Sequence, residues 1–504
     1  MHKERKVIFL GLDGVSLSDL QRIVERENMP FFKWLLGRSL KSEPKVIIPY
    51  TAPSWTTVAT GVNPGKHGIF DFIKPLPNGE IGVVKSDEVM YPRINEVLAL
   101  NNLPSITFNL IYSYPPLPKK ENTLVVASWA SPKPKAWPFD VVKFIKKISG
   151  GWPPLRASTI EAYVDKIVFS LEKKINVQLE IAEKYGWKLC FTVFHEPDWI
   201  FHRAYREVLE GRKFRSALKV FRLIDSYLKK LYEIANAETM IILASDHGFM
   251  EVKNFINVNL ALKKAGFLTM SRPQGLRGVL FKTVLEIFQR LPHVKHKLKY
   301  KALQFMELLN FKVGFGRDPL ASPIDYRESV AYMASLYYIY VNRRLNETNR
   351  IAVREKIISS LSSIKEYFTV VMPGNEFFWG PYAKRAPDIV LIPREGFTVS
   401  PRLLSKKIVD RGMWYVHSPN GLATIYVPNL TADKNVEITQ LDLVPTALAY
   451  LGLPVPHDAD GHVVDTVRHV CENIKQKNYA SIYRNLREMR NRIKHFTHKK
   501  RITH

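Results

Sequence analysis

Residues 6–14 read KVIFLGLDG, an apolar run that ends in an aspartate and a glycine. A short run of this kind is typical of a strand that is buried on both faces of a parallel sheet. The basic start of the chain imitates a signal sequence, but the apolar stretch Val7–Leu12 is short, and Asp13 interrupts it without a small-residue cleavage site. We therefore expect Val7–Leu12 to be the first strand of the fold.

Further apolar runs of the same kind follow along the chain: Ser105–Leu110, Leu124–Ser128, Leu189–Phe194, Met240–Ala244, Asp388–Ile392 and Ala423–Val427. Between them lie Tyr163–Glu183 and Lys213–Ala235, in which apolar residues recur every three or four positions, as on one face of a helix. Strands that alternate with helices predict an α/β fold with a mostly parallel central sheet flanked by helices. Ligands bind beyond the carboxyl ends of strands in such sheets, so the residues after each strand are the candidates for function.

The composition is that of a globular protein of 504 residues, enough for one large domain or two ordinary ones. Hydrophobic residues make up 46% and aromatic residues 12%, which excludes a largely disordered chain. The two cysteines, Cys190 and Cys471, are too few for a disulfide scaffold or a zinc–thiolate site. We therefore expect a cytoplasmic protein, and the hydropathy of the chain predicts no transmembrane segment.

The chain is strongly basic, with 74 Lys and Arg against 47 Asp and Glu and a net charge of +27. Segment 271–316 carries nine basic and two acidic residues and predicts an inserted pair of helices; segment 466–504 carries eleven and two and predicts a basic helical tail. Such charge favours anionic partners: a phosphate-ester substrate, an acidic membrane surface or nucleic acid. A chain that is simply rich in lysine and arginine would look the same.

Two polar residues stand where a predicted strand or helix meets a loop. Asp13 follows the first strand, where a carboxylate either binds a cation or caps the next helix. Thr51 precedes Pro53, which suits a first helical turn, so the hydroxyl of Thr51 stands at a helix entrance. It either caps this helix or acts as a nucleophile, with a metal lowering its pKa and the helix end favouring an anionic phosphoryl group. For Asp13 and for Thr51, the residue alone does not distinguish a helix cap from a functional role.

Other candidates are histidines and aspartates after later strands. Asp198 and His202 lie four positions apart in a predicted helix, where they can bind one ion or form a surface ion pair. Asp246 and His247 end a strand in the phrase SDHG, which is either a pair of ligands or a strand-end turn. His417 precedes another strand and is either a ligand or a loop histidine. Together these side chains predict one crevice with two divalent ions, zinc or manganese, that clamp a phosphoryl group.

The same phrases resemble the alkaline phosphatase superfamily, and most closely its type I phosphodiesterase/nucleotide pyrophosphatase branch. The similarity is carried, in the family's order, by LDG (12–14), YTAPSWTTVATGVNPGKHGIF (50–70), PDWIFH (197–202), SDHG (245–248), HSPNG (417–421) and ITQLDLVPTALAYLGLPVPHDADG (438–461). The resemblance spans roughly residues 6–465 without the basic insertion. It implies an alkaline phosphatase-like catalytic domain over residues 1–465, followed by the tail 466–504.

The resemblance also implies a role for each candidate residue. It assigns two groups of metal ligands, namely Asp198, His202 and His417 for one ion, and Asp13, Asp246 and His247 for the other. The second ion would also coordinate Thr51. Thr51 would attack phosphorus and form a phosphothreonine intermediate that is then hydrolysed. The expected function is therefore metal-dependent hydrolysis of phosphoesters, of the phosphodiesterase/nucleotide pyrophosphatase kind.

One position departs from the family pattern. Nucleotide pyrophosphatases place an asparagine a few residues after the HGI phrase, where its amide binds a phosphoryl oxygen, and Phe72 stands there in this chain. A phenyl ring cannot donate that hydrogen bond. Nucleotide pyrophosphatase activity therefore does not follow from the metal ligands alone.

Two alternative functions remain open from the sequence. A phosphomutase or phospho-group transferase of the same superfamily would typically have a serine nucleophile and a large domain between its metal motifs, unlike Thr51 and the short gap from Asp13. A basic nucleic-acid-binding protein on an inactive hydrolase scaffold would explain the charge. It would not explain a ligand at every metal position, and no nucleic-acid-binding signature is present in the sequence.

Overall fold

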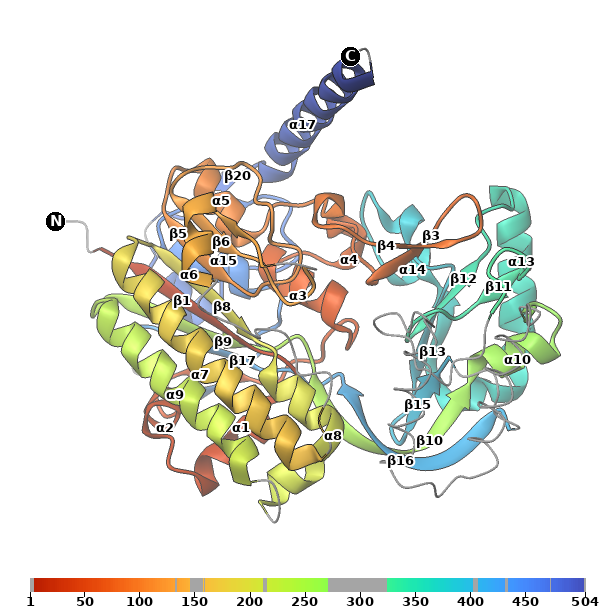
Figure 1. The fold of residues 1–504 in the computed structure, drawn as a ribbon, viewed down its shortest axis with the longest axis horizontal. Helices are drawn as coiled ribbons and strands as arrows, with labels where there is room; N and C mark the ends of the chain where they lie inside the picture. The colour runs from red at the N-terminus through yellow and green to blue at the C-terminus, as the bar shows by residue number, and fades with distance from the viewer. Residues whose placement is uncertain are drawn as a thin grey trace.

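The computed structural model describes residues 4–131, 134–145, 157, 159–211, 215–270, 324–401, 407–430, 434–471 and 473–502. Figure 1 shows a larger α/β lobe and a smaller lobe beside it, joined by the long strands β10 (Gly248–Asn257) and β16 (Val409–Ser418). The basic insertion expected at 271–316 lies outside the described residues.

The larger lobe is built on a nine-stranded sheet within the described residues, in the order β18-β2-β17-β9-β1-β8-β5-β6-β7. Five adjacent strands in the centre of this sheet run parallel to one another, namely β9, β1, β8, β5 and β6. Strand β17 runs antiparallel to both of its neighbours, β9 and β2. Strand β7 runs antiparallel to β6. The bounds are β1 (Lys6–Leu12), β2 (Leu40–Ser42), β5 (Ser105–Phe108), β6 (Thr123–Val126), β7 (Ala136–Trp137), β8 (Leu189–Phe194), β9 (Thr239–Ala244), β17 (Ala423–Tyr426) and β18 (Lys434–Asn435). The prediction of a mostly parallel sheet is confirmed.

Helices cover both faces of this sheet because successive side chains of a strand point to opposite faces. Ile8 and Leu10 of β1 belong to the core under α7 (Ile160–Lys184) and α9 (Arg215–Ile234). Val7 and Phe9 belong to the core under α3, α5 and α15 on the opposite face. The bounds of these three helices are α3 (Thr51–Thr60), α5 (Ile94–Leu100) and α15 (Leu443–Tyr450). The helical predictions for 163–183 and 213–235 correspond to α7 and α9.

The smaller lobe contains a four-stranded antiparallel sheet in the order β11-β12-β14-β13. Its strands are β11 (Ala331–Tyr332), β12 (Tyr338–Val341), β13 (Phe368–Pro373) and β14 (Ile389–Pro393). The run 388–392 is thus a strand, as its composition indicates, but it does not belong to the central sheet. An apolar run shows that a strand is buried but not which sheet buries it.

A second sheet links the lobes, with β10 between β16 and β15 (Phe397–Ser400). Further elements of the smaller lobe and of its border are β3 (Ile73–Pro75), β4 (Ile81–Val83), α4 (Pro64–His67), α10 (Val258–Lys264), α13 (Glu347–Ser360) and α14 (Gly374–Phe377). Further elements of the larger lobe are α1 (Leu17–Arg26), α2 (Pro30–Leu36), α6 (Val142–Ile145), α8 (Glu196–Glu210), α16 (Asp465–Arg468), β19 (Val455–Pro456) and β20 (Gln476–Lys477).

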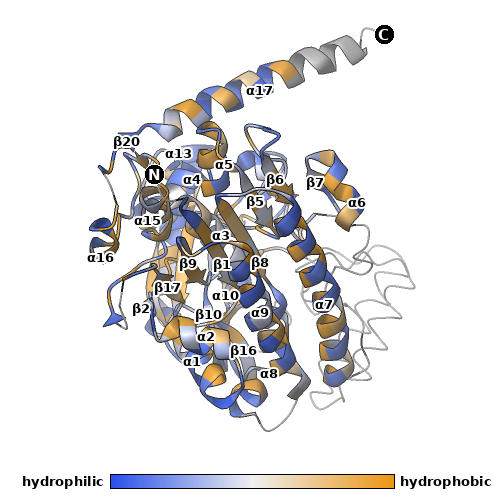
Figure 2. Ribbon diagram, turned by 90° about the vertical axis from the view of Figure 1, so that its left-hand side faces the viewer, coloured by the Kyte–Doolittle hydropathy of each residue, from blue (hydrophilic) through white to orange (hydrophobic). Residues whose placement is uncertain are grey.

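The chain closes with helix α17 (Tyr479–Ile502), which projects from the larger lobe in Figures 1 and 2. The expected tail 466–504 does not project along its whole length. Val467 and Tyr479 are fully buried and belong to the core on the α3 side of the central sheet. Only the later part of α17 therefore leaves the body of the protein.

Candidate active site

The carboxyl ends of three neighbouring strands bring the first candidate residues together. Strand β1 lies between β8 and β9, so Asp13, which follows β1, lies beside Asp246, which follows β9. The backbone N–H of Gly14 donates to Asp246 Oδ1 at 3.3 Å, which ties the two strand ends together. Gly11 allows helix α3 to approach β1, because a Cβ atom there would lie 2.4 Å from the ring of Trp55.

One group of possible metal ligands consists of Asp13, Asp246 and His247, all of them buried. Their ligand atoms lie within 4.8 Å of one another. His247 Nε2 is 3.2 Å from Asp246 Oδ2 and 3.7 Å from Asp13 Oδ1. Both of these carboxylate oxygens are buried without a hydrogen-bond partner. Because a buried carboxylate oxygen without a donor is costly, this group is suited to a divalent cation.

The other group consists of Asp198, His202 and His417. Asp198 and His202 lie one turn apart on α8, as the sequence predicts, and Asp198 Oδ1 is 3.4 Å from His202 Nε2 and 3.3 Å from His417 Nε2. The Nε2 atoms of the two histidines are 3.1 Å apart. Asp198 Oδ1 is also buried without a hydrogen-bond partner. Two imidazole nitrogens and a carboxylate oxygen thus converge, which is a donor set typical of zinc.

Two of these histidines are held in one tautomer by the backbone. Nδ1 of His247 lies 3.1 Å from the carbonyl oxygen of Gly248, and Nδ1 of His417 lies 3.0 Å from that of Pro49. Because a carbonyl oxygen only accepts, each Nδ1 carries the proton and donates it. The Nε2 atom of each ring therefore presents a lone pair to the centre of its group, as metal-binding histidines do.

Thr51 is the first residue of α3, and its hydroxyl oxygen lies 3.4 Å from His247 Nε2. The residue that caps α3 is Tyr50, and the residue that caps α1 is Ser16, whose side chain accepts from the amide of Asp19. Neither Thr51 nor Asp13 is therefore a helix cap. The first turn of α3 also directs backbone N–H groups toward the site, which favours a negatively charged ligand there.

Buried negative charge dominates the electrostatics of the site. Burial raises the pKa of Asp246 well above its usual value, and the neighbouring carboxylates of Asp13 and Asp198 raise it further. Burial also lowers the pKa of His247 well below its usual value, and the adjacent His417 adds to this shift. A buried carboxyl that is costly to ionise beside its neighbours, next to a histidine that stays neutral, is an arrangement that a positive ion would stabilise.

Two residues that sequence reasoning missed hold Asp13 in place. Trp55 Nε1 donates to Asp13 Oδ2 at 3.1 Å, and Nδ1 of His195 forms a close ion pair with the same oxygen. His195 Nε2 lies 3.0 Å from the carbonyl oxygen of Asn109, which only accepts, so Nε2 carries a proton and donates it. Burial alone would lower the pKa of His195, but the Asp13 carboxylate raises it. These contacts engage only Oδ2, so Asp13 Oδ1 faces His247, another member of its ligand group.

A second pair of missed residues supports the loop that carries Asp246. Gln440 Nε2 donates to the carbonyl oxygens of Ser245 and Asp246, at 2.6 Å and 3.1 Å. Ser54, on α3, donates its hydroxyl to the same Asp246 carbonyl. The sequence gives only a weak indication of this support. Ser54 and Gln440 lie within the family-like phrases 50–70 and 438–461, but neither has a side chain typical of a metal ligand.

Phe72 lies in an aromatic cluster next to α3. Its ring centroid is 5.6 Å from that of Tyr50, 6.1 Å from that of Trp129 and 6.4 Å from that of Tyr112. Tyr50 immediately precedes Thr51. An aromatic surface therefore stands where the family pattern has an amide.

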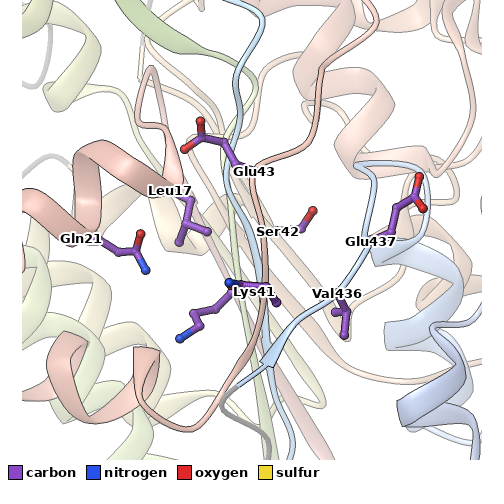
Figure 3. A pocket seen from close by; sticks show the side chains of 8 residues that line it. Leu17, Gln21, Lys41, Ser42, Glu43, Val436 and Glu437 are labelled. Carbon is purple, nitrogen blue, oxygen red and sulfur yellow. The ribbon is translucent and has the colours of Figure 1, made fainter.

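The structure also has a cavity of 480 Å³ at the edge of the central sheet. Figure 3 shows the side chains around it, which come from α1, from β2 and the residue after it, and from the end of β18 and the two residues after it. They belong to Leu17, Gln21, Lys41, Ser42, Glu43, Asn435, Val436 and Glu437. None of the candidate site residues lines this cavity, so the strand-end groups and not the cavity define the candidate active site.

The sequence profile of the type I phosphodiesterase / nucleotide pyrophosphatase family matches residues 7–414. The protein belongs to this family, and it is a phosphoester hydrolase with an alkaline phosphatase-like fold. This membership favours the hydrolase over the phosphomutase and over the nucleic-acid-binding protein. A comparison with curated proteins gives no match.

Solved structures share the fold at low sequence identity. Phosphonoacetate hydrolase from Sinorhizobium meliloti 1021 is similar with a TM-score of 0.56 and 14% identity, over 89% of this chain and 96% of that one. Murine ectonucleotide pyrophosphatase / phosphodiesterase 5 gives a TM-score of 0.52 and 14% identity, over 93% and 100%. The alkaline phosphatase PafA gives 0.53 and 13%, over 92% and 98%. At these identities the likeness establishes the architecture alone.

Proposed function

We propose that the protein hydrolyses phosphoesters with Thr51 as the nucleophile and two divalent cations, zinc or manganese, as cofactors. The observation that carries this proposal is the set of buried oxygens without a hydrogen-bond partner, Asp13 Oδ1, Asp246 Oδ2 and Asp198 Oδ1. Each of them faces an imidazole nitrogen within its own group of three ligands. Both groups therefore have the donors and the negative charge that a divalent cation requires, and only His202 among their residues is exposed.

The cations, when bound, would polarise the phosphoryl oxygens and favour the ionised forms of the Thr51 hydroxyl and of water. Thr51 Oγ1 would attack phosphorus and give up its proton to solvent, while the bond from phosphorus to the ester oxygen breaks. The ester oxygen would take up a proton from solvent and leave as an alcohol. Water then attacks the phosphothreonine, which releases phosphate or a phosphomonoester and restores the hydroxyl. Asp13 keeps its orientation through these steps, because Trp55 and His195 hold its other oxygen.

We further propose that the substrate is a phosphodiester whose substituent packs against the aromatic cluster of Tyr50, Phe72 and Trp129. Phe72 cannot bind a phosphoryl oxygen by a hydrogen bond, but its ring offers apolar contact area at that point. A substrate with an apolar or aromatic group on the ester therefore suits this site better than inorganic pyrophosphate or a small monoester.

The experiment combines metal analysis with the nucleophile variant Thr51→Ala. We expect the purified wild type, loaded with zinc or manganese, to hold about two ions per chain and to turn over bis-p-nitrophenyl phosphate faster than p-nitrophenyl phosphate. Thr51→Ala should retain both ions and lose turnover, whereas Thr51→Ser, which keeps a hydroxyl, should retain part of it. A Thr51→Ala variant that works as well as the wild type would remove Thr51 from the mechanism.

The strong positive charge of the protein also supports an anionic partner for its basic tail. Charge alone does not distinguish an acidic membrane surface from nucleic acid. The arrangement of apolar side chains on α17 bears on this choice.

A further inference from the structure

The first turns of α17 are anchored to the larger lobe by one face of the helix. Tyr479 and Tyr483 are buried, and Tyr483 donates its hydroxyl to Glu96 at 3.3 Å. Arg487 donates to the carbonyl oxygen of Val89 at 2.6 Å. Tyr479, Tyr483 and Arg487 recur every four residues, so they define the face with which the helix docks on the protein. This anchoring fixes the direction in which the rest of the helix projects.

A different face of α17 carries a stripe of apolar side chains. It consists of Ile482, Leu486, Met489 and Ile493, which we call the apolar stripe. The side chains of Met489 and Ile493 are 58% and 62% exposed. Because each residue turns an α-helix by about 100°, the stripe lies beside the docking face and not on it. Figure 2 shows the resulting alternation of hydrophobic and hydrophilic residues along the helix.

Positive charge lies on one side of the apolar stripe. Arg492 is exposed and precedes Ile493, so it lies about 100° from Ile493, on the side of the stripe away from the docking face. Arg490 lies on the docking face, and its Nε atom is buried. Over its whole length α17 contains eight Lys or Arg and one acidic residue, Glu488. A helix with exposed apolar residues and a strong excess of positive charge has the pattern of helices that lie in the headgroup region of an anionic bilayer.

The apolar stripe separates a membrane from the other anionic partner. A nucleic acid would be bound through the charges, because its affinity comes mainly from phosphate contacts, and it gives no role to exposed Met489 and Ile493. Within the described part of the chain, no helix is long and apolar enough to cross a bilayer. A contact with lipid through α17 would therefore be lateral, along the surface.

We propose that α17 docks the protein on an anionic lipid surface, with the apolar stripe at the acyl boundary and with Arg492 among the headgroups. The length of the described stripe, about 16 Å, allows its side chains to enter the same interface together. This docking site is independent of the proposed hydrolase mechanism, because none of its residues belongs to either group of metal ligands.

The test is flotation of the full chain with lipid vesicles. We expect binding to vesicles of phosphatidylcholine and phosphatidylglycerol at about 3:1 and little binding to phosphatidylcholine alone. The double variant Met489→Gln, Ile493→Gln should lower the partition coefficient about tenfold or more, because two apolar contacts are lost. The variant Arg492→Gln should lower it several-fold, and so should salt raised to about 0.5 M.

The matched control is Phe169→Gln on α7, which removes an apolar side chain that is 60% exposed and lies outside the apolar stripe. It should leave the partition coefficient unchanged, and circular dichroism should confirm that each variant keeps its helix content. The proposal is overturned if the wild type does not bind the anionic vesicles, or if Met489→Gln, Ile493→Gln binds them as well as the wild type does.

Two other outcomes would assign the apolar stripe differently. Tight binding of a DNA duplex that depends on Arg492 but not on Met489 and Ile493, without vesicle binding, would identify a nucleic-acid contact. A wild-type dimer in sedimentation velocity that the Met489→Gln, Ile493→Gln variant converts to a monomer, again without vesicle binding, would mean that a second copy of the chain covers the stripe. Either result would overturn the membrane proposal.

Discussion

The imidazole rings of His247 and His417 stack on each other, with centroids 3.5 Å apart and planes inclined by 18°. One ring belongs to each group of candidate ligands, so the two groups adjoin. Both rings are also held at Nδ1 by backbone carbonyls, which prevents either from turning away. Two stacked rings cannot both be protonated without repulsion, which agrees with the low pKa of His247 that burial and His417 produce. A change in the position or charge of one of these rings should therefore also alter the ligand group to which the other ring belongs.

Removing one ligand from either group should lower the metal content. We expect Asp246→Asn and His417→Ala each to reduce the number of bound ions from about two to about one or fewer, and to reduce turnover at least a hundredfold. Plasma mass spectrometry of dialysed protein measures the first effect. His462→Ala, at a histidine whose side chain is 73% exposed, is the control and should change neither quantity. Full activity of metal-free protein would exclude the two-metal mechanism.

His195 is expected to be a positioning residue for Asp13. His195→Ala removes the imidazole ring that holds Asp13 Oδ2, so the Asp13 side chain should become free to rotate. Loss of such a supporting contact typically weakens metal binding about 10–100-fold. Calorimetric titration of the metal-free protein should show this loss for one ion and a smaller change for the other. Equal affinity in the variant and the wild type would mean that Trp55 alone is sufficient to orient Asp13.

Phe72 should limit the activity toward nucleotide substrates. Phe72→Asn introduces an amide donor, and a hydrogen bond to a charged oxygen contributes about 1.5–3 kcal/mol, so kcat/KM for a nucleotide diester should rise about tenfold or more. Phe72→Leu, which removes the ring without adding a donor, is the matched control and should not raise it. If both variants raise kcat/KM equally, the ring obstructs the substrate and the missing donor is not the cause.

Asp71 should make the stability of the protein depend on pH. Burial raises the pKa of its carboxyl from 3.8 to about 6, although Ser335 and Tyr340 donate hydrogen bonds to it. Between these two pH values the unfolded chain ionises Asp71 and the folded chain does not, so the free energy of unfolding falls as pH rises and is constant above about pH 6. The total effect is roughly 3 kcal/mol.

The variant Asp71→Asn lacks this titration. Its free energy of unfolding, relative to that of the wild type, should therefore increase by roughly 3 kcal/mol between pH 4 and pH 6.5, whatever the difference is at pH 4. Urea denaturation across this range measures the difference. A difference that stays constant with pH would mean that the folded protein keeps Asp71 ionised.

The sequence predicts the part of the fold that local patterns encode. Buried strands such as Val7–Leu12 and Leu189–Phe194 are visible as short apolar runs, and the spacing of Asp198 and His202 already places them one helical turn apart. The sheet to which the run 388–392 belongs depends on contacts with distant strands, and no local pattern reports it. The antiparallel direction of β17 could not be predicted either, because it also depends on pairing with strands far away in the sequence.

The candidate site shows the same division. Asp13 and Thr51 are ambiguous in the sequence because a helix cap and a site residue have the same composition, and the structure removes the ambiguity by giving the caps to Ser16 and Tyr50. The support from His195 and Gln440 could not be predicted, because it consists of hydrogen bonds between segments far apart in the chain. Sequence patterns identify the side chains that do the chemistry more readily than the side chains that hold them.

The position of β17 between β9 and β2 has a consequence for synthesis of the protein on the ribosome. Strand β9 is complete at Ala244, but β17 begins only at Ala423, roughly 180 residues later, which takes a ribosome about 10–35 s. During this interval the edge of β9 that β17 will cover exposes unpaired backbone groups to other chains. The nascent chain also contains Asp13, Asp246 and His247 before it contains His417. The two groups of candidate ligands therefore become available in a fixed order.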